Sequence, residues 1–446
     1  MNDDSAARPD DEFRELFEKF LSGNGDIDPA ALAGAAGLPR DPAALQALFA
    51  QLRNALSQPT SPEATAQLAL DQAISAAGQN DRSIDAESST AFGHAFDVAD
   101  IWLTDATEFG ALQARPVLLT RREWVRLTMP VWNALSTPVS SRISDAMTSL
   151  LESQTPEDLV GELGGASGVL RSLGGTLFAM QLGHVVGQLA SEVVSGGDIG
   201  VALLPDGKAA LLPHNVSALA TGLDIDEQEV RLYLAVRELA HARLFHHARW
   251  LPLDLQSALT AYAQGIRIDA SPLEHLMDDF DPSNPEELRA ALTDGRLIPP
   301  KTEDQERALS RIETQLAHIE GWVDVVTHEA TRRLPKADAL SETMRRRRAG
   351  GGPAESAFAA LVGLELRPRR LREASMMWRR ITDAVGVNAR DALWAHPDLM
   401  PTGDDIDDPA ALIDRVVATA RGDAPMQDDM DRALDDLLRG DAPPEN

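Results

Sequence analysis

The sequence has no cysteine, only four lysines and few aromatic residues. The absence of cysteine excludes disulfide bonds, a thiolate nucleophile and a cysteine-ligated metal, so any metal must be held by His, Asp or Glu side chains. The 70 acidic residues outnumber the 41 lysines and arginines, which leaves a formal net charge of −29 at pH 7. We therefore expect no nucleic-acid partner and no binding to an anionic membrane surface.

The sequence also lacks an apolar leader, because its opening MNDDSAARPDDEF is acidic. We predict no secretory signal there and expect a cytoplasmic protein. The twenty residues Ser172–Ser191 carry no formal charge, which is the length of a membrane span. Their glutamines, histidine and four glycines are unlike a span, so we predict a buried helix in which Gly183 and Gly187 allow another helix to approach closely.

The most informative stretch is Val230–Leu251, whose apolar residues recur at helical spacing. Asp226 is placed to cap this helix, and Glu229 follows three residues later in a capping-box arrangement. Three polar residues fall on one apolar face at spacings of three and four: Arg237, Glu238 and His241. Because buried polar groups need partners, this cluster predicts a metal site, an ion pair or a catalytic site.

The segment Arg-Glu-Leu-Ala-His is one residue away from the metallopeptidase signature His-Glu-x-x-His. In that signature two histidines one helical turn apart bind zinc, and the glutamate activates the zinc-bound water. Glu238 stands at the place of the base and His241 at that of the second ligand, whereas Arg237 replaces the first ligand. A guanidinium has no free lone pair, so Arg237 cannot bind zinc.

A second helix is predicted over Asp304–Leu334. It carries Glu320, Asp324 and His328 at steps of four, which aligns them on one face. Gly321 interrupts this helix at a cost of about 1 kcal/mol relative to alanine, and we interpret it as permitting close packing beside the central helix.

Two shorter features complete the pattern. Val201–Leu204 and Ala209–Leu212 flank the turn sequence Pro-Asp-Gly-Lys and predict a β-hairpin. The run Arg345–Arg348 precedes three glycines. We interpret this run as a solvated helix end, with pairing to internal carboxylates as the alternative.

Several ordered blocks together resemble one protein family. They are GTLFAMQLGHVVGQLASEVVSGGDIG from Gly175, RELAHARLF from Arg237, EGWVDVVTHEA from Glu320 and the arginine-rich block that ends at Ala374. They resemble the actinobacterial zinc-dependent-metalloprotease-like, or zincin-like, family, some members of which are associated with deazaflavin-cofactor biosynthesis. The resemblance implies zinc as cofactor and a peptide or protein as partner.

The resemblance also implies roles for the second helix. Zincins with a glutamate ligand present a Glu-x-x-x-Asp pair, in which the glutamate binds the metal and the aspartate lies behind a ligating histidine. In this sequence the pair is Glu320 and Asp324. By the same resemblance, the hairpin before the central helix is similar to the edge strand that binds substrate peptides.

Three functional hypotheses follow. In the first, the protein is a zinc hydrolase with His241 and Glu320 as ligands, Glu238 as general base and another residue in place of the missing histidine. In the second, which we favour, Arg237 supplies the positive charge of the lost metal by reaching Glu320, Asp324 or both, and the protein is a non-catalytic binding or scaffold module. In the third, Glu238 and His241 form a metal-free acid–base pair, and Arg237 holds an anionic substrate.

The predicted fold is mainly α-helical, with a zincin-like core and one or two small β-hairpins. Three regions are expected: a small helical region over residues 1–60, the core over 61–402, and an acidic, largely disordered tail over 403–446.

Overall fold

A computed structural model describes residues 61–154, 163–265, 301–349, 359 and 370–421 of this protein. This part of the chain is mostly helical, which confirms the predicted mainly α class. The predicted N-terminal region, residues 1–60, lies outside the described residues.

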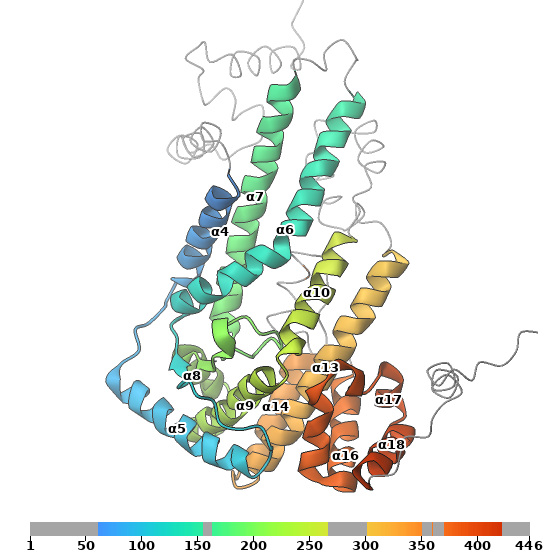
Figure 1. The fold of residues 1–446 in the computed structure, drawn as a ribbon. Coiled ribbons are helices and arrows are strands. Elements are labelled where there is room, and N and C mark those ends of the chain that lie inside the picture. The colour runs from blue at the N-terminus through green and yellow to red at the C-terminus, as the bar shows by residue number, and fades with distance from the viewer. Residues whose placement is uncertain (1–60, 155–162, 266–300, 350–358, 360–369, 422–446) are drawn as a thin grey trace, which may run out of the picture.

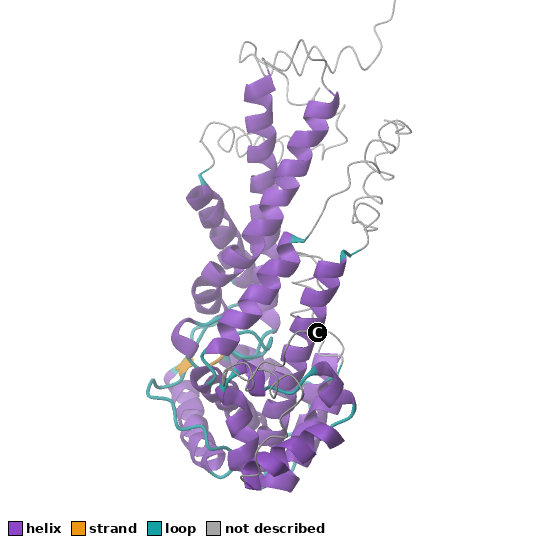
Figure 2. Cartoon of the chain, turned by 45° about the vertical axis from the view of Figure 1, so that its right-hand side comes forward, coloured by secondary structure: helices purple, strands orange, loops and turns teal. Residues whose placement is uncertain are grey.

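Two long helices extend from a larger helical base (Figures 1 and 2). They are α6 (Arg121–Gln154) and α7 (Leu163–Glu192), and α4 (Pro62–Ala77) packs along α7. The base contains α5 (Ala86–Thr104), α8 (Pro213–Thr221), α9 (Glu227–His247), α14 (Ala337–Ala349) and α16 (Leu371–Ala392). A further pair, α10 (Trp250–Gln264) and α13 (Glu303–Thr331), extends out of the base.

The uncharged segment forms the C-terminal part of α7. Gly183 and Gly187 face α4 so closely that a Cβ at Gly183 would lie 2.5 Å from the carbonyl oxygen of Ala69. This confirms the predicted close helix approach. The helix is not buried all round, since Gln181 and His184 are exposed. None of the helices that the structure describes combines the length and apolar character of a membrane span.

The predicted hairpin is wrong. Val201–Leu204 form no strand, and the turn after them is the short 3₁₀ helix η2 (Pro205–Gly207). Strand β2 (Ala210–Leu211) instead pairs in parallel with β1 (Val117–Leu118). The reason lies in the backbone of Ala210, whose N–H donates to Glu238 and whose carbonyl accepts from Gly196, so neither group is free to pair with residues 201–204.

The first part of the predicted tail is helical. Gly403–Asp407 form α17 and Ala410–Arg421 form α18, and both helices pack on α16. Thr402 caps α17 in a capping box with Asp405, and Arg415 of α18 donates to Asp405 at 2.9 Å. Residues 422–446 lie outside the described residues.

Gly321 packs against a different helix from the one expected. A Cβ at Gly321 would lie 2.8 Å from the Cβ of Ala374 and 2.9 Å from its carbonyl carbon, so the glycine lets α16, and not the central helix α9, approach α13. On the other side of α13, Glu320 and Asp324 are directed towards α9 and α14. The glycine therefore helps to position the helix that carries the candidate site.

Candidate active site

The site is built on α9, a helix surrounded by other elements. Asp226 caps it as predicted and accepts a hydrogen bond from the Gln228 N–H at 2.7 Å. The capping box does not form, because Glu229 accepts from the backbone N–H of Lys336 instead. All residues from Tyr233 to Phe245 are buried. A helix covered on every side must satisfy its polar side chains internally.

Arg237 donates a hydrogen bond to the Glu320 Oε2 atom across the α9–α13 interface. The Arg237 residue is 6% exposed and Glu320 is 0% exposed, so this is a fully buried ion pair. Burial alone would raise the pKa of Glu320, but the charges of Arg348 and Arg237 outweigh it and hold this pKa well below its usual range. The contact that the sequence predicted between these residues is present.

A second arginine completes the enclosure of Glu320. Arg348, at the end of α14, donates to Glu320 Oε1 at 2.7 Å and to the Asp198 carbonyl at 2.8 Å. Its neighbour Arg347 donates to the Asp198 carboxylate at 2.9 Å. Interpreting the arginine run as a solvated helix end is therefore wrong for both residues, and the alternative, pairing with internal carboxylates, is correct.

Glycine makes this enclosure sterically feasible. Gly200 has a φ of +74°, a backbone conformation that disfavours side chains. A Cβ at Gly200 would lie 2.8 Å from Arg348 Nη2 and 2.9 Å from Glu320 Oε1. The segment that carries Asp198 can therefore lie directly against the ion cluster.

His241 lies beside the same carboxylate. Its Nε2 atom is 3.4 Å from Glu320 Oε1, and its Nδ1 atom is 3.1 Å from the carbonyl of Arg237. The structure thus brings together the two predicted zinc ligands, His241 and Glu320. His328, which lies on α13 beyond them, pairs with Asp338 at 3.7 Å and is not part of the cluster.

The partner of Asp324 is Arg345, and not Arg237. Arg345 donates to Asp324 through Nε and Nη2, at 3.1 Å and 2.8 Å, and Ser341 donates to the same carboxylate at 3.2 Å. The predicted arrangement in which Asp324 lies behind the residue at position 237 is therefore replaced by a fork-shaped pair with α14. This pair accounts for a third member of the arginine run.

Glu238 is bound by backbone groups on both of its oxygens. The N–H of Gly197 donates to Oε2 and that of Ala210 donates to Oε1, each at 2.8 Å. Burial raises the pKa of Glu238, because the surrounding protein cannot solvate its charge as water does, while these N–H groups act in the opposite direction. Glu238 thus holds the segment before β2 against α9.

The donor set does not fit a zinc ion. The place of the first ligand is filled by a guanidinium, and both oxygens of Glu320 are bound by arginines. Zinc sites use three or four lone-pair donors around one point. Within the described ranges, no group of three or more His, Cys, Asp or Glu side chains is arranged to hold a metal ion.

A family model described as zincin-like metallopeptidase matches residues 63–413. The chain belongs to the zincin-like metallopeptidase family. In this zincin-like protein, the matched residues span nearly all the helices described above, from α4 into α18. No curated protein matches its sequence significantly.

The zincin-like fold has a counterpart among solved structures. A protein from Chloroflexus aurantiacus, described as a candidate hydrolase with a novel fold, aligns with a TM-score of 0.54 and 18% sequence identity. The alignment covers 78% of this chain and 97% of that one. At this identity the similarity shows a shared fold.

Proposed function

We propose that this protein is a zincin-like family member in which Arg237 takes the place of the metal, and that it acts as a binding or scaffold module. The observation that carries the proposal is the buried contact of Arg237 with Glu320. A guanidinium there neutralises the carboxylate that would otherwise bind zinc. The narrower resemblance to actinobacterial members associated with deazaflavin biosynthesis stays a prediction.

The surroundings of Glu238 also support a non-catalytic role. A general base must reach the proton that it abstracts, yet both Glu238 oxygens accept backbone hydrogen bonds. The cavity that Glu238 lines with Gly197 and His241 has a volume of about 20 Å³. This is room for about one water molecule and not for a peptide bond with its neighbours.

Among the described residues β1 pairs with β2 alone, and its other edge is a candidate surface for a peptide partner. Val117 donates its N–H to the carbonyl of Ala209 and Leu119 donates to that of Leu211, each at 3.0 Å, so the N–H of Leu118 points to the opposite side. Val117 and Leu118 also line a groove of about 890 Å³ between residues 115–118 and α5. We propose that an extended peptide adds to β1 as a further strand, in the manner of β-augmentation.

One probe tests both parts of the proposal. Protein purified without chelators is analysed for zinc and mixed with fluorescein-labelled casein, an extended polypeptide that metallopeptidases cleave. We expect essentially no zinc, saturable binding of casein and no cleavage. Leu118→Pro removes the outward N–H together with a partly buried leucine side chain. An edge strand tolerates proline, and the variant should weaken binding at least fivefold.

The competing hypotheses give different results. About one zinc per chain, with cleavage that Glu238→Gln abolishes, would establish the zinc hydrolase with His241 and Glu320 as ligands. Cleavage without metal that is lost in Glu238→Gln would favour the acid–base pair. Casein binding that Leu118→Pro leaves unchanged would refute the β1 surface.

A further inference from the structure

The helical wall of the groove beside β1 carries a regular stripe of small and polar residues. Ser89, Gly93 and Asp97 of α5 line this wall, and β1 with Arg115 and Pro116 forms the opposite one. The three α5 residues are spaced by four, so they lie on one face of the helix. A peptide in the groove therefore lies between β1 and this stripe.

Gly93 lies in the interior of α5 with no other element of the protein packed against it. Glycines inside other helices allow close contacts within the chain, because a Cβ at Gly183 or Gly321 would lie 2.5 Å or 2.8 Å from an atom of a neighbouring helix. Gly93 is exposed, and a Cβ there would meet no atom within 4 Å. Glycine destabilises a helix relative to alanine, but it lets another backbone approach closely. The open space at Gly93 thus fits the main chain of a bound peptide.

Asp97 places an exposed carboxylate one helical turn beyond Gly93. Among the described residues, no arginine or lysine pairs with it. Asp85, which lines the other end of the same wall, accepts a hydrogen bond from the Ser88 N–H at 2.7 Å and has no basic partner in the described part of the chain either. The groove lining thus holds two aspartates against one arginine, Arg115, and this charge favours a basic peptide.

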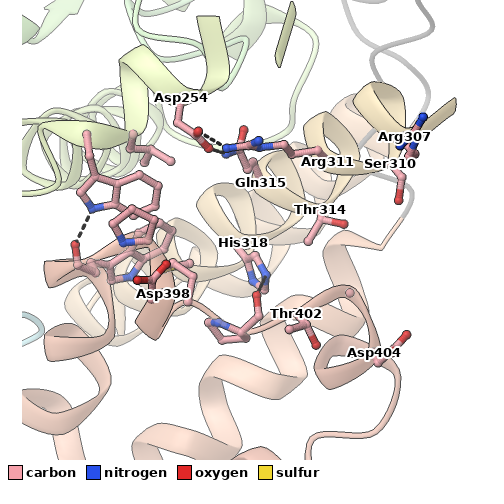
Figure 3. A pocket seen from close by; sticks show the side chains of 17 residues that line it. Asp254, Arg307, Ser310, Arg311, Thr314, Gln315, His318, Asp398, Thr402 and Asp404 are labelled. Atoms are coloured by element: carbon pink, nitrogen blue, oxygen red, sulfur yellow. Dashed lines mark hydrogen bonds and ion pairs between the residues drawn. The ribbon is translucent and has the colours of Figure 1, made fainter. Parts of the chain in front are cut away.

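The charges of a second cavity are paired within the protein to a greater extent. This cavity has a volume of about 600 Å³ and lies between α10, α13 and residues 394–404 (Figure 3). Asp254 accepts hydrogen bonds there from Arg311 and Gln315, which the dashed lines in Figure 3 mark. Arg307 pairs with Asp304. A charged ligand would compete with these pairs, whereas Asp97 is available to a ligand in the groove beside β1.

Building on the β1 surface proposed above, we propose that its partner is a basic, extended peptide. The main chain of the peptide crosses α5 at Gly93, and a lysine or arginine side chain of the peptide pairs with the Asp97 carboxylate. Main-chain hydrogen bonds to β1 supply affinity for any sequence. Gly93 and Asp97 then select among peptides, because one admits the backbone and the other attracts a cationic side chain.

Three labelled heptapeptides test the charge preference by fluorescence anisotropy. They alternate threonine and valine and differ only at the central residue, which is lysine, norleucine or glutamate. At about 0.15 M salt, which screens the long-range field of the acidic protein, the lysine peptide should bind about threefold more tightly than the norleucine peptide, and the glutamate peptide most weakly.

Asp97→Asn should abolish the preference for lysine over norleucine. Asp383→Asn, at an exposed position of α16 outside the groove, makes the same change in net charge and should retain the preference. Equal binding of the lysine and norleucine peptides to wild type, or a lysine preference that survives Asp97→Asn, would overturn the proposal.

Gly93→Leu tests the path of the peptide main chain. The new Cβ meets no atom of the protein and the side chain fills the groove, so the lysine peptide should bind about tenfold more weakly or worse. His94→Leu, at the next exposed position and outside the groove, is the matched control and should bind as wild type does. Unchanged binding in Gly93→Leu would overturn the proposal.

Leu118→Pro separates this inference from the function on which it rests. If Leu118→Pro weakens binding of the lysine peptide while Gly93→Leu and Asp97→Asn do not, the β1 surface stands and the basic peptide along α5 is refuted. If none of the three variants changes binding, both proposals are refuted.

Discussion

Arg237 and Glu320 are 83 residues apart in the sequence and form a buried hydrogen-bonded ion pair between α9 and α13. In the function that we propose, this pair takes the place of the first zinc ligand of the signature and of the glutamate ligand on the downstream helix. On that proposal, one substitution in the signature changes the chemistry of the whole site, because the guanidinium neutralises the carboxylate and leaves no position for a metal ion.

Arg237→His tests whether the zinc geometry is still present behind the arginine. The variant restores His-Glu-x-x-His and frees the Oε2 atom of Glu320, so we expect about one zinc per chain after dialysis against zinc. Metal analysis of the dialysed protein measures this. The double variant Arg237→His/Arg348→Met also frees Oε1 and should bind zinc more tightly.

Arg231→His is the matched control for that experiment. It places a histidine on the same helix, at a position where Arg231 pairs with Glu227 and does not touch Glu320. If neither variant at position 237 binds more zinc than Arg231→His, then Glu320 is not placed as a ligand and the inherited geometry is absent.

Glu320→Gln should destabilise the protein more than Arg237→Met. Loss of the carboxylate charge leaves Arg237 and Arg348 buried side by side, whereas loss of Arg237 leaves Glu320 paired with Arg348. Breaking such a buried cluster costs about 3–5 kcal/mol. Urea unfolding gives the free energy of unfolding of both variants, to be compared with that of wild type.

Asp304→Asn is the control for that comparison, because it removes an exposed ion pair. It removes the pair between Asp304 and Arg307, whose side chains are 83% and 75% exposed, and should cost less than about 1 kcal/mol. A Glu320→Gln variant no less stable than Asp304→Asn would show that the cluster contributes nothing to folding.

Glu238→Gln should lower stability by about 1–3 kcal/mol. The amide that replaces the carboxylate has one acceptor oxygen, so its NH₂ group must face the N–H of either Gly197 or Ala210. Urea unfolding measures the loss, and Glu342→Gln, on an exposed ion pair of α14, is the control. Equal stability of wild type and Glu238→Gln would contradict the structural role of this residue.

Stability should also depend on pH through His318. Its pKa is lowered to about 4 by burial, so between pH 6.5 and 4 the unfolded chain binds a proton that the folded protein does not. The free energy of unfolding therefore falls as pH decreases through this window, by about 3 kcal/mol in total.

His318→Phe removes this contribution, and the pH dependence of its urea unfolding should be flatter than that of wild type. Other groups titrate in the same range, so the difference between the two curves is the quantity to compare. His246→Phe, at an exposed position, should retain the wild-type curve. Parallel curves for wild type and His318→Phe would mean that folding does not lower the pKa of His318.

Helical spacing alone was sufficient to predict the central elements. The apolar period of α9 placed Arg237, Glu238 and His241 on one face, and the steps of four on α13 placed Glu320 and Asp324 on another. The incomplete signature and the family resemblance then predicted that Arg237 reaches Glu320, Asp324 or both, and the structure shows the contact with Glu320.

Other features of the site depend on contacts between segments that are remote in sequence, which helical spacing does not predict. The sequence did not predict the role of Asp198, because this residue belongs to no motif and its position between glycines on an acidic chain gave no sign of burial. Which arginine reaches Glu320, and which reaches Asp324, depends on how the end of α14 packs against residues 194–200. The partners of Glu238 depend in the same way on the path of the chain before β2.

The sequence by itself thus determined the helical class, the face of each central helix and the charge that replaces a ligand, since these follow from local periodicity and side-chain chemistry. Only the tertiary structure decided that two arginines enclose Glu320, that Glu238 binds backbone groups and that Ala210–Leu211 pair in parallel with β1. These contacts join residues that are remote in sequence, and the packing of whole helices selects among several partners that are chemically equivalent.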